Sequence, residues 1–366
     1  MPNPFLTKRL ESVRRAIAEK ELDGLLLSDI VNISYVSGFT GSTAFALVTP
    51  QEALFITDPR YTLRARQECP HFALIQAAGS GGYADALKTT LAARPGLKKL
   101  GFEAGALKVT QWQQLQKENS DAIQWTPTEG LVEELRQIKD ETEIGATRRA
   151  IAVAEAAFAQ IIPLLSPGVS EREVAIELEF AMRRGGAEDR AFETIVASGE
   201  QGAHPHHRPN DRLLEAGDLV TIDWGARVDG YHSDITRTVG IGSLTDEQRS
   251  VYAAVLESQR LAIAAIAPGK TGKEIDAVAR DFLTAAGHDE AFSHSLGHGL
   301  GRTVHDGLGL SQRGENVILK PGMILTVEPG VYREGWGGVR IEEDVQVTDN
   351  GCEVLTHLTN ALTVYG

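Results

Sequence analysis

A pattern that occurs twice in the second part of the chain limits its fold more than any other feature of the sequence. Pro-Gly-x-Ser/Thr-x-x-Glu stands at residues 167–173 and again at residues 268–274, so the two copies begin 101 residues apart. In each copy the hydroxyl residue, Ser170 or Thr271, should cap a helix by accepting the amide hydrogen of the glutamate three positions later. That glutamate should reach back to the amide of the capping residue. Because each copy also follows a helical segment, the pattern predicts the same helix, loop and capped helix twice.

The same order of signals continues beyond these helices. An apolar strand that ends in a carboxylate occupies residues 217–223, and its counterpart occupies residues 322–328. Each is followed by a Gly-x-x-x-carboxylate segment, at residues 230–234 and 338–342. One capping box arises easily by chance, but the whole series in the same order does not. We therefore predict two related α+β halves packed about a pseudo-two-fold axis, each contributing two acidic residues to a common centre.

The first part of the chain shows short apolar strands that alternate with helices. A first helix carries Leu10, Val13 and Ile17 on one face and should end at Gly24. We expect strands at residues 25–27, 44–48, 53–57, 97–102 and 122–125, and helices at residues 61–68, 83–93 and 109–117. This alternation is typical of an α/β domain.

The length of 366 residues is enough for two domains, each with its own core. A long helical run over residues 135–165 begins the second part of the chain. We place the α/β domain at residues 1–128 and the duplicated α+β domain at residues 129–366.

Charge and hydropathy exclude several classes of partner. The net charge is −14 with a pI near 5.2, and no long basic run is present, so we expect no nucleic-acid binding. No stretch reaches the ~18 apolar residues of a membrane span, and residues 1–24 are charged throughout, unlike a signal peptide. Cys69 and Cys352 match no paired spacing and read as reduced core thiols. We therefore expect a cytoplasmic protein without a membrane anchor.

A hairpin brings the two carboxylates of the first half together. Asp229-Gly230 tolerates the positive φ of a type I′ turn, so Val228 should pair with Tyr231. This pairing puts Asp223 opposite residue 236, and Asp234 is two positions away on the same strand. Because side chains alternate with a period of two, Asp223 and Asp234 should share one face of the hairpin, unless a bulge at the turn reverses the parity.

The second half offers a matching pair of acidic residues and a histidine. Glu328 ends an apolar run and should be buried, and a buried glutamate must be paired or coordinated. Glu342 lies on an alternating strand whose later polar residues, Asp344 and Gln346, should face water. His298 lies between glycines that disfavour a helix, so a loop or strand should present it. The candidate ligands are therefore Asp223, Asp234, His298, Glu328 and Glu342.

Four carboxylates and one imidazole indicate a particular kind of metal centre. Two divalent ions would match this donor set, and oxygen ligands with one imidazole favour Mn, Co or Fe over a thiolate-rich zinc site. Mn is the expected ion, with Co, Zn or Fe as alternatives. The chain contains no complete dinucleotide fingerprint, no GxxxxGK[ST], no GxSxG and no HExxH motif, so these chemistries have no support.

Several segments taken together resemble the pita-bread metallopeptidases, the group that contains methionine aminopeptidase, prolidase and Xaa-Pro aminopeptidase. They are TIDWGARVDGYHSDITRTV, SHSLGHGLGRTVHDG, LKPGMILTVEPGVY and GGVRIEEDV, within residues 130–366. YVSGFTGS and TDPRYT are similar to the creatinase-type N-terminal domain of the proline-specific members. The resemblance implies an α/β creatinase-type domain followed by an α+β pita-bread domain with an internal pseudo-two-fold duplication. It also implies two metal ions held by the same five candidate ligands.

The resemblance extends to residues on the substrate side of the site. It implies that His206, His294 and His305 contact substrate. Glu328 is the candidate for proton transfer, and Arg340 should orient the carboxylates from behind. His204 and His207 crowd the loop of His206 and are expected to be solvated, whereas His232 has no assigned role.

The resemblance points to small peptides with proline at the second position. We expect an Xaa-Pro aminopeptidase that releases the N-terminal residue, with an Xaa-Pro dipeptidase as the alternative. A metal-free peptide-binding module is a more remote alternative. Relatives with this N-terminal domain commonly form homodimers, so a homodimer is expected by analogy.

Overall fold

A computed structural model describes residues 3–78, 82–119, 123–307 and 309–366. The chain forms two compact units, Met1–Arg136 and Gln137–Gly366. This division falls after the predicted boundary at residue 128. The reason is that most of the short helix α6 (Glu133–Gln137) packs with the first unit, where Arg136 donates a hydrogen bond of 2.6 Å to Oδ1 of Asn32.

The first unit contains a six-stranded mixed sheet. Strands β1 and β2 and strands β2 and β3 pair antiparallel, whereas the outer pairs are parallel. The strand order is β4 (Ala73–Gln76), β3 (Ala53–Thr57), β2 (Phe45–Val48), β1 (Gly24–Leu27), β5 (Lys99–Glu103) and β6 (Gln124–Thr128).

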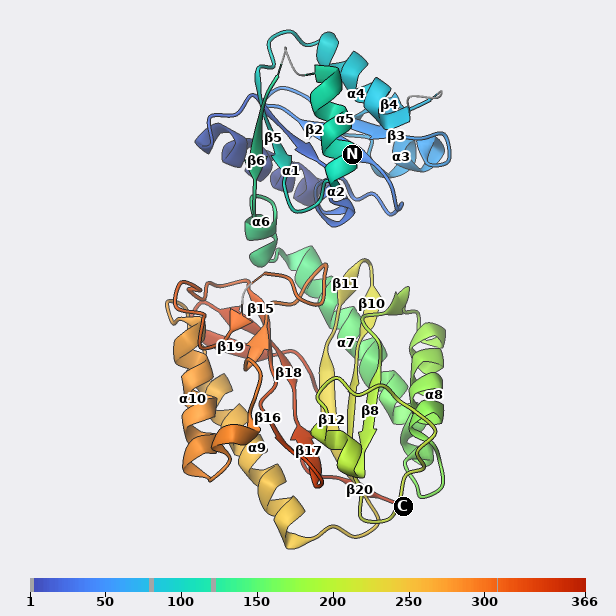
Figure 1. The fold of residues 1–366 in the computed structure, drawn as a ribbon, viewed down its shortest axis with the longest axis vertical. Coiled ribbons are helices and arrows are strands. Elements are labelled where there is room, and N and C mark those ends of the chain that lie inside the picture. Colours follow the sequence, from blue (N-terminus) through green and yellow to red (C-terminus); the bar gives the residue numbers. More distant parts are fainter. Residues whose placement is uncertain (1–2, 79–81, 120–122, 308) are drawn as a thin grey trace. The chain divides into compact units, whose positions relative to one another are not determined.

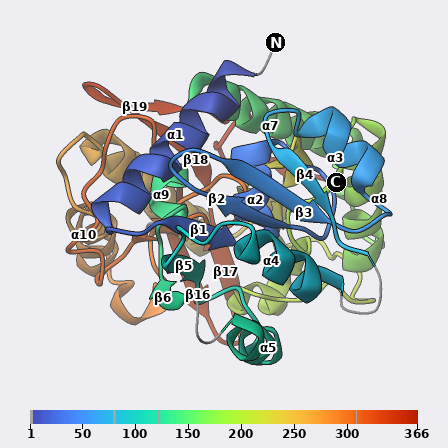
Figure 2. The ribbon, with the colours of Figure 1, turned by 90° about the horizontal axis from the view of Figure 1, so that it is seen from above.

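Helices cover both faces of this sheet (Figure 2). Leu25 and Leu27 of β1 point into one apolar cluster, and Leu26 between them points into the other, as the period of two requires. The first cluster contains residues of α1 (Pro4–Glu19), α2 (Ile30–Ser37) and α3 (Thr62–Glu68). The second contains residues of α4 (Gly82–Ala92) and α5 (Val109–Asn119).

The predicted elements of this unit are present, with some differences. Helix α2 and the edge strand β4 were not predicted, and residue 122 of the last predicted strand lies outside the described residues. Gly24 does not end the first helix, because α1 already ends at Glu19. Gly24 instead begins β1, where a side chain would come within 3.0 Å of the carbonyl oxygen of Val48.

Two helix pairs flank the strands of the second unit, one pair on each side (Figure 1). They are α7 (Glu141–Ile161) with α8 (Glu171–Arg184), and α9 (Asp246–Ala265) with α10 (Gly272–Ala285). The predicted helical run 135–165 is broken before α7, because Asp140 caps that helix in a reciprocal capping box with Glu143. Short 3-10 turns occupy η1 (Ile162–Leu164), η2 (Gly199–Ala203) and η3 (Asp289–Ala291).

The strands between these helices form several small sheets. One contains β8 (Ile195–Ser198), β9 (Leu219–Trp224), β12 (Ile235–Ile241) and β20 (Val364–Tyr365), and another contains β7 (Asp189–Arg190), β10 (Ala226–Val228) and β11 (Tyr231–His232). The second half contains β15 (Ile324–Val327), β18 (Glu343–Thr348) and β19 (Gly351–Val354). Two hairpin pairs complete it, β13 (Gly297–His298) with β14 (Gly309–Leu310) and β16 (Gly330–Arg333) with β17 (Gly337–Arg340).

The internal duplication is confirmed at the level of individual contacts. Ser170 forms an isolated bridge to Leu213, and Thr271 forms the equivalent bridge to Ile318 in the other half. Both hydroxyl residues cap the helix that follows. Only Thr271 has the reciprocal bond from its glutamate, so the predicted capping box is complete in the second copy and one-sided in the first.

Each half of the second unit has its own apolar core. In the core of the first half, Phe158 of α7 stacks on Trp224 of β9, with ring centroids 4.8 Å apart.

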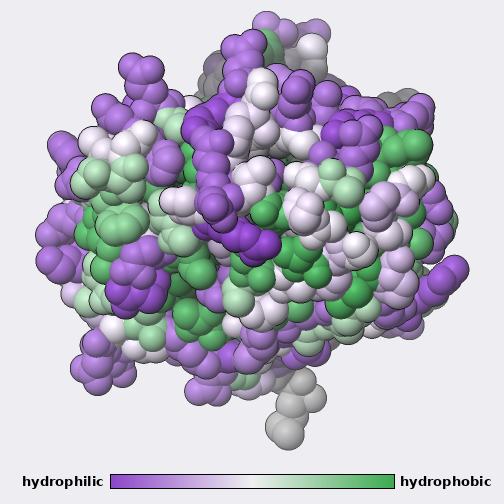
Figure 3. Space-filling view, turned by 90° about the horizontal axis from the view of Figure 1, so that it is seen from below, coloured by the Kyte–Doolittle hydropathy of each residue, from purple (hydrophilic) through white to green (hydrophobic). Residues whose placement is uncertain are grey.

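The surface seen in Figure 3 mixes hydrophobic and hydrophilic residues across the whole face. Among the described residues, no helix is both long and apolar enough to cross a membrane. Cys69 is buried, Cys352 is partly buried, and neither forms a disulfide.

Candidate metal centre

All nine residues predicted to act at the site line one cleft of the second unit, with a volume of about 850 Å³. They come from both halves of the duplication. The predicted ligands are Asp223, Asp234, His298, Glu328 and Glu342, and the other four residues are His206, His294, His305 and Arg340.

The hairpin of the first half has the predicted register. Val228 pairs with Tyr231, and Asp229 and Gly230 in the turn have φ values of 51° and 74°. The same register continues to Asp223, which lies opposite Thr236. No bulge reverses the parity, so Asp223 and Asp234 lie on the same face.

The second half places its two glutamates directly opposite each other. Val327 pairs with Glu343, and Gly330 pairs with Arg340, in one continuous antiparallel register. Between these two pairs the regular ladder is interrupted, and the register puts Glu328 across from Glu342. Because directly opposed residues are close neighbours on one face, both carboxylates reach the cleft.

His298 completes the cluster from β13. Its backbone amide donates to Oγ1 of Thr326 over 3.0 Å. Its Nε2 lies 3.5 Å from Oδ2 of Asp234 and 3.5 Å from Oε1 of Glu328. A glycine precedes it because a side chain at Gly297 would collide with the carbonyl of Thr326.

Burial and mutual repulsion make the carboxylates costly to ionise. Burial raises the pKa of Glu328 to about 8, against the lowering effect of Arg340. Burial and the charges of Glu342 and Asp223 raise the pKa of Asp234 well above its usual range. The pKa of Glu342 rises for the same reasons, with burial first and Glu328 second. Four acidic groups in one buried place therefore need positive charge nearby.

The donor set fits divalent cations. Ligand atoms of Asp234, His298 and Glu342 all lie within 4.8 Å of one another. Oδ1 of Asp223 is buried and has no hydrogen-bond partner among the described residues, so a lone pair is left for another ligand. Burial lowers the pKa of His298 to about 4, so its imidazole is neutral near pH 7, as a metal ligand must be.

Two groups hold the carboxylates in place from behind. Arg340 is 3% exposed and donates from Nη2 to Oδ2 of Asp223 over 2.7 Å. Thr236 donates from Oγ1 to Oε2 of Glu342 over 2.6 Å and accepts a bond of 3.2 Å from Nε of Arg340. The orienting role predicted for Arg340 therefore has a direct contact to support it.

Tyr332, which was not predicted as a site residue, joins Arg340 to His294. Nη1 of Arg340 donates to the Tyr332 hydroxyl over 3.0 Å, and that hydroxyl lies 2.8 Å from Nε2 of His294. Because the Tyr332 oxygen accepts from Arg340, its hydrogen points to His294. The other ring nitrogen of His294 lies 2.8 Å from the carbonyl oxygen of Ser295. The position of Tyr332 on β16, four residues after Glu328, was the available signal.

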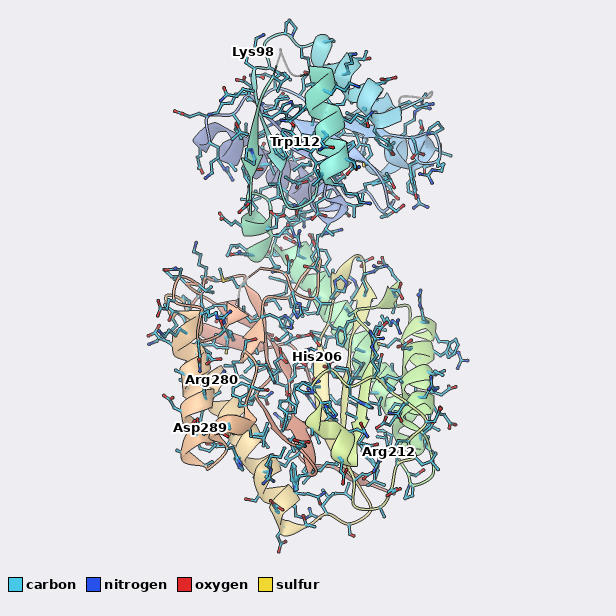
Figure 4. The ribbon with its side chains drawn as sticks, viewed as in Figure 1. Lys98, Trp112, His206, Arg212, Arg280 and Asp289 are labelled. Atoms are coloured by element: carbon cyan, nitrogen blue, oxygen red, sulfur yellow. The ribbon has the colours of Figure 1, made fainter. Side chains whose placement is uncertain are left out.

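His206 and His305, the other two histidines predicted to contact substrate, also line the cleft. Figure 4 places His206 in the middle of the unit, between the two halves. The His305 ring packs edge-on against His298, with centroids 4.2 Å apart. His206 and His305 are both exposed, so a ligand in the cleft can reach them.

Of the three histidines near the site motifs that had no predicted function, His207 and His232 differ from a solvated loop residue. His204 is exposed as predicted, but the side chain of His207 is 9% exposed and its Nε2 lies 2.8 Å from Oε2 of the buried Glu171. The prediction for His207 was wrong because Glu171 lies 36 residues away in the sequence. His232 is buried, and its Nδ1 lies 3.0 Å from the carbonyl oxygen of Gly301.

Asp344 is a further correction. The alternation along β18 predicted a water-facing residue, but its side chain is fully buried and accepts the backbone amide of Asp234 over 3.2 Å. This bond shows that the first half of the unit packs against this face of β18. Gln346, two positions later, is partly exposed.

Two family descriptions match the chain. Residues 145–349 match Metallopeptidase family M24, and residues 9–138 match the Creatinase/Prolidase N-terminal domain. The first match covers the duplicated unit that contains the cleft, and the second covers the α/β unit.

Relatives of similar length accompany these matches. An Xaa-Pro dipeptidase from Pyrococcus furiosus is 37% identical over 353 residues, which is 96% of this chain and 98% of the relative. The solved structure of an Xaa-Pro dipeptidase from Bacillus anthracis has a TM-score of 0.93 at 41% identity, covering 98% and 99% of the two chains. That of an X-Pro aminopeptidase from Thermotoga maritima has a TM-score of 0.89 at 38% identity, covering 96% and 99%.

Proposed function

The chain belongs to metallopeptidase family M24, and from this premise we propose that it is an Xaa-Pro dipeptidase that uses two divalent cations. One observation carries the proposal: the five predicted cation ligands and the four further predicted site residues line a single cleft. Relatives named as Xaa-Pro dipeptidases support the dipeptidase reading over the aminopeptidase expected from the sequence.

Asp223, Asp234, His298, Glu328 and Glu342 would hold the cations. When bound, divalent cations polarise a carbonyl oxygen and lower the pKa of a water toward neutrality. Manganese is the proposed ion, because oxygen donors with one imidazole suit it well. We also propose a homodimer, by analogy with relatives that carry the same N-terminal domain.

Glu328 is placed to move the proton that hydrolysis requires. Its carboxylate lies 3.5 Å from Nε2 of His298 and across the strands from Glu342, and both glutamates line the cleft. It would accept a proton from the attacking water and deliver it to the leaving nitrogen, which is the nitrogen of proline. A bond to proline is a tertiary amide without an N–H, so recognition must come from other groups.

The residues around the carboxylates would bind and orient the peptide. His206 and His305 in the cleft can hydrogen-bond the substrate carbonyl or a terminal group. His294 already has partners at both ring nitrogens, so its role in this arrangement is to hold Tyr332. Burial lowers the pKa of His294 to about 4, and a neutral ring keeps that hydrogen bond near pH 7.

An Xaa-Pro aminopeptidase is the second candidate. The cleft extends past the carboxylates to Ile176 and Glu179 of α8, which offers room for residues beyond proline. The similar solved structure from Thermotoga maritima is that of an X-Pro aminopeptidase.

A peptide-length comparison tests the proposal. The protein, loaded with Mn²⁺, is assayed on Ala-Pro, Ala-Pro-Ala and Ala-Ala. We expect kcat/KM to be at least about ten times higher for Ala-Pro than for either other peptide, a difference of about 1.4 kcal/mol in transition-state binding. A preference for Ala-Pro-Ala would favour the aminopeptidase, and no cleavage of either proline peptide would overturn both readings.

A further inference from the structure

Gln259 of α9 is a buried amide in an otherwise apolar part of the core. It is 1% exposed, and its neighbours on the buried face of the helix, Val255 and Ala262, belong to the apolar cluster of the second half. Burying a polar amide is costly unless it forms hydrogen bonds. Its partners therefore indicate what it does.

The Gln259 amide bridges the two strands that carry the second pair of carboxylates. Nε2 donates to the carbonyl oxygen of Val327 over 3.0 Å and to that of Ile341 over 2.7 Å. These two residues directly precede Glu328 and Glu342. One side chain thus fixes both strands at the points where the two glutamates project into the cleft.

Pro329 explains why the carbonyl of Ile341 needs a donor from a side chain. The strand register places Pro329 opposite Ile341, and the amide of Ile341 donates a long bond of 3.5 Å to the carbonyl of Pro329. In an antiparallel pair of this kind the opposite residue returns a second bond. Proline has no N–H and cannot do so, and Gln259 supplies the missing donor.

The duplication provides an internal comparison. The separation of 101 residues between the helix repeats places Phe158 at the position equivalent to Gln259. Phe158 stacks on Trp224, which follows Asp223 as Pro329 follows Glu328. Trp224 has a backbone N–H and sits in a regular strand pair with Ile235. The amide is therefore present in the half whose strand contains proline, and the repeated fold does not require it.

We propose that Gln259 is a positioning residue that sets the placement of Glu328 and Glu342 for cation binding. The inference rests on the proposed function only in taking these glutamates as cation ligands. It assigns the Gln259 side chain to the cation site, although Gln259 itself does not line the cleft.

Cation affinity measures this role directly. Mn²⁺ is titrated by calorimetry into chelator-treated wild-type protein and into Gln259→Met, which keeps the length of the side chain and removes both donors. We expect the dissociation constant to rise about 10- to 100-fold, as for other residues that orient metal ligands. Tyr252→Phe is the matched control, because its hydroxyl is on the same helix and donates to the carbonyl of Asn360, away from the cleft. It should leave Mn²⁺ affinity unchanged.

A rescue variant separates positioning from simple core packing. Pro329→Ala restores a backbone N–H opposite Ile341, so Gln259→Met should cost less Mn²⁺ affinity in that background, at least about threefold less. Equal losses in both backgrounds would overturn the proposal. So would unchanged affinity in Gln259→Met, a wild-type protein that binds no Mn²⁺, or a Gln259→Met protein that fails to fold and does not recover in the double variant.

Hydrolysis is measured separately on the wild type. A wild-type protein that binds Mn²⁺ but cleaves no proline peptide overturns the proposed function, while the titrations still decide the role of Gln259.

Discussion

Arg340 of β17 and Asp223 of β9 form a buried ion pair that joins the two halves of the duplicated unit at the cleft. The distance from Nη2 to Oδ2 is 2.7 Å, and the two side chains are 3% and 13% exposed. The pair leaves the other carboxylate oxygen of Asp223 without a partner among the described residues. Arg340 thus satisfies one side of the carboxylate and leaves the other side for a cation.

Arg340→Met should therefore destabilise the metal-free protein more than the Mn²⁺-loaded protein. Without Arg340, Asp223 is a buried charge with no compensation, which typically costs about 3–5 kcal/mol of unfolding free energy. Bound Mn²⁺ would replace part of the lost positive charge. We also expect kcat/KM on Ala-Pro to fall about 10- to 100-fold. Denaturant unfolding with and without Mn²⁺, together with the peptide assay, measures both effects.

Arg94→Met is the matched control for this experiment. Arg94 forms a two-pronged pair with Glu52 in the first unit, where both groups are partly exposed. Its loss should cost less than about 1 kcal/mol, with no dependence on Mn²⁺. If Arg340→Met lost equal stability with and without Mn²⁺, the assignment of Asp223 to the cation site would be wrong.

Glu328→Gln should remove nearly all turnover without harming the fold. The amide keeps the shape of the side chain but cannot accept a proton, and loss of general acid–base catalysis typically lowers kcat by about 10²- to 10⁴-fold. Metal-free stability should not fall, because the substitution removes a carboxyl group whose pKa burial raises to about 8. Steady-state kinetics and thermal unfolding check these two results. Activity within a few-fold of wild type would exclude Glu328 from proton transfer.

The parts of the site that local rules control could be predicted from the sequence. The Asp229-Gly230 turn and the period of two along a strand were enough to place Asp223 and Asp234 on one face. The duplication then directed attention to Glu328 and Glu342, and the strand register of the structure adds that they lie opposite each other.

Long-range packing accounts for what could not be predicted. Asp344 reads as a surface residue within its own strand, but the first half of the unit packs against it and the amide of Asp234 donates to its carboxylate. His207 is fixed by Glu171, 36 residues away, and Tyr332 contacts His294, 38 residues away, and Arg340 on the next strand. Alternation along one strand contains no information about such neighbours.

Tyr332→Phe should reduce kcat more than it changes KM. The hydroxyl connects Arg340 to His294, so its removal frees both side chains to move beside the carboxylates. We expect kcat to fall about tenfold and stability to fall by about 1 kcal/mol, the net value of a typical hydrogen bond. Tyr83→Phe removes a hydroxyl that donates to Asp58 in the first unit and should leave kcat unchanged. Equal kcat in wild type and Tyr332→Phe would contradict a role for this hydroxyl at the site.

The metal-free protein should lose stability as the pH rises from about 6.5 to 8. The pKa of Glu328 is raised from 4.5 to about 8, so above pH 4.5 the folded protein binds more protons than the unfolded chain and its stability falls with pH. The pKa values of His294 and His298 are lowered from 6.5 to about 4, which has the opposite effect, but only below pH 6.5. Above that pH the loss of stability caused by the raised pKa of Glu328 is unopposed.

We expect Tm of chelator-treated protein to drop by several degrees between pH 6.5 and 8, since ~1 kcal/mol corresponds to about 2–4 °C in a domain of about 150–250 residues. Saturating Mn²⁺ should abolish the drop by neutralising the carboxylates, and Glu328→Gln should reduce it without metal. A Tm of the metal-free protein that stays level or rises between pH 6.5 and 8 would mean that the carboxylates do not carry the burial cost inferred from the structure.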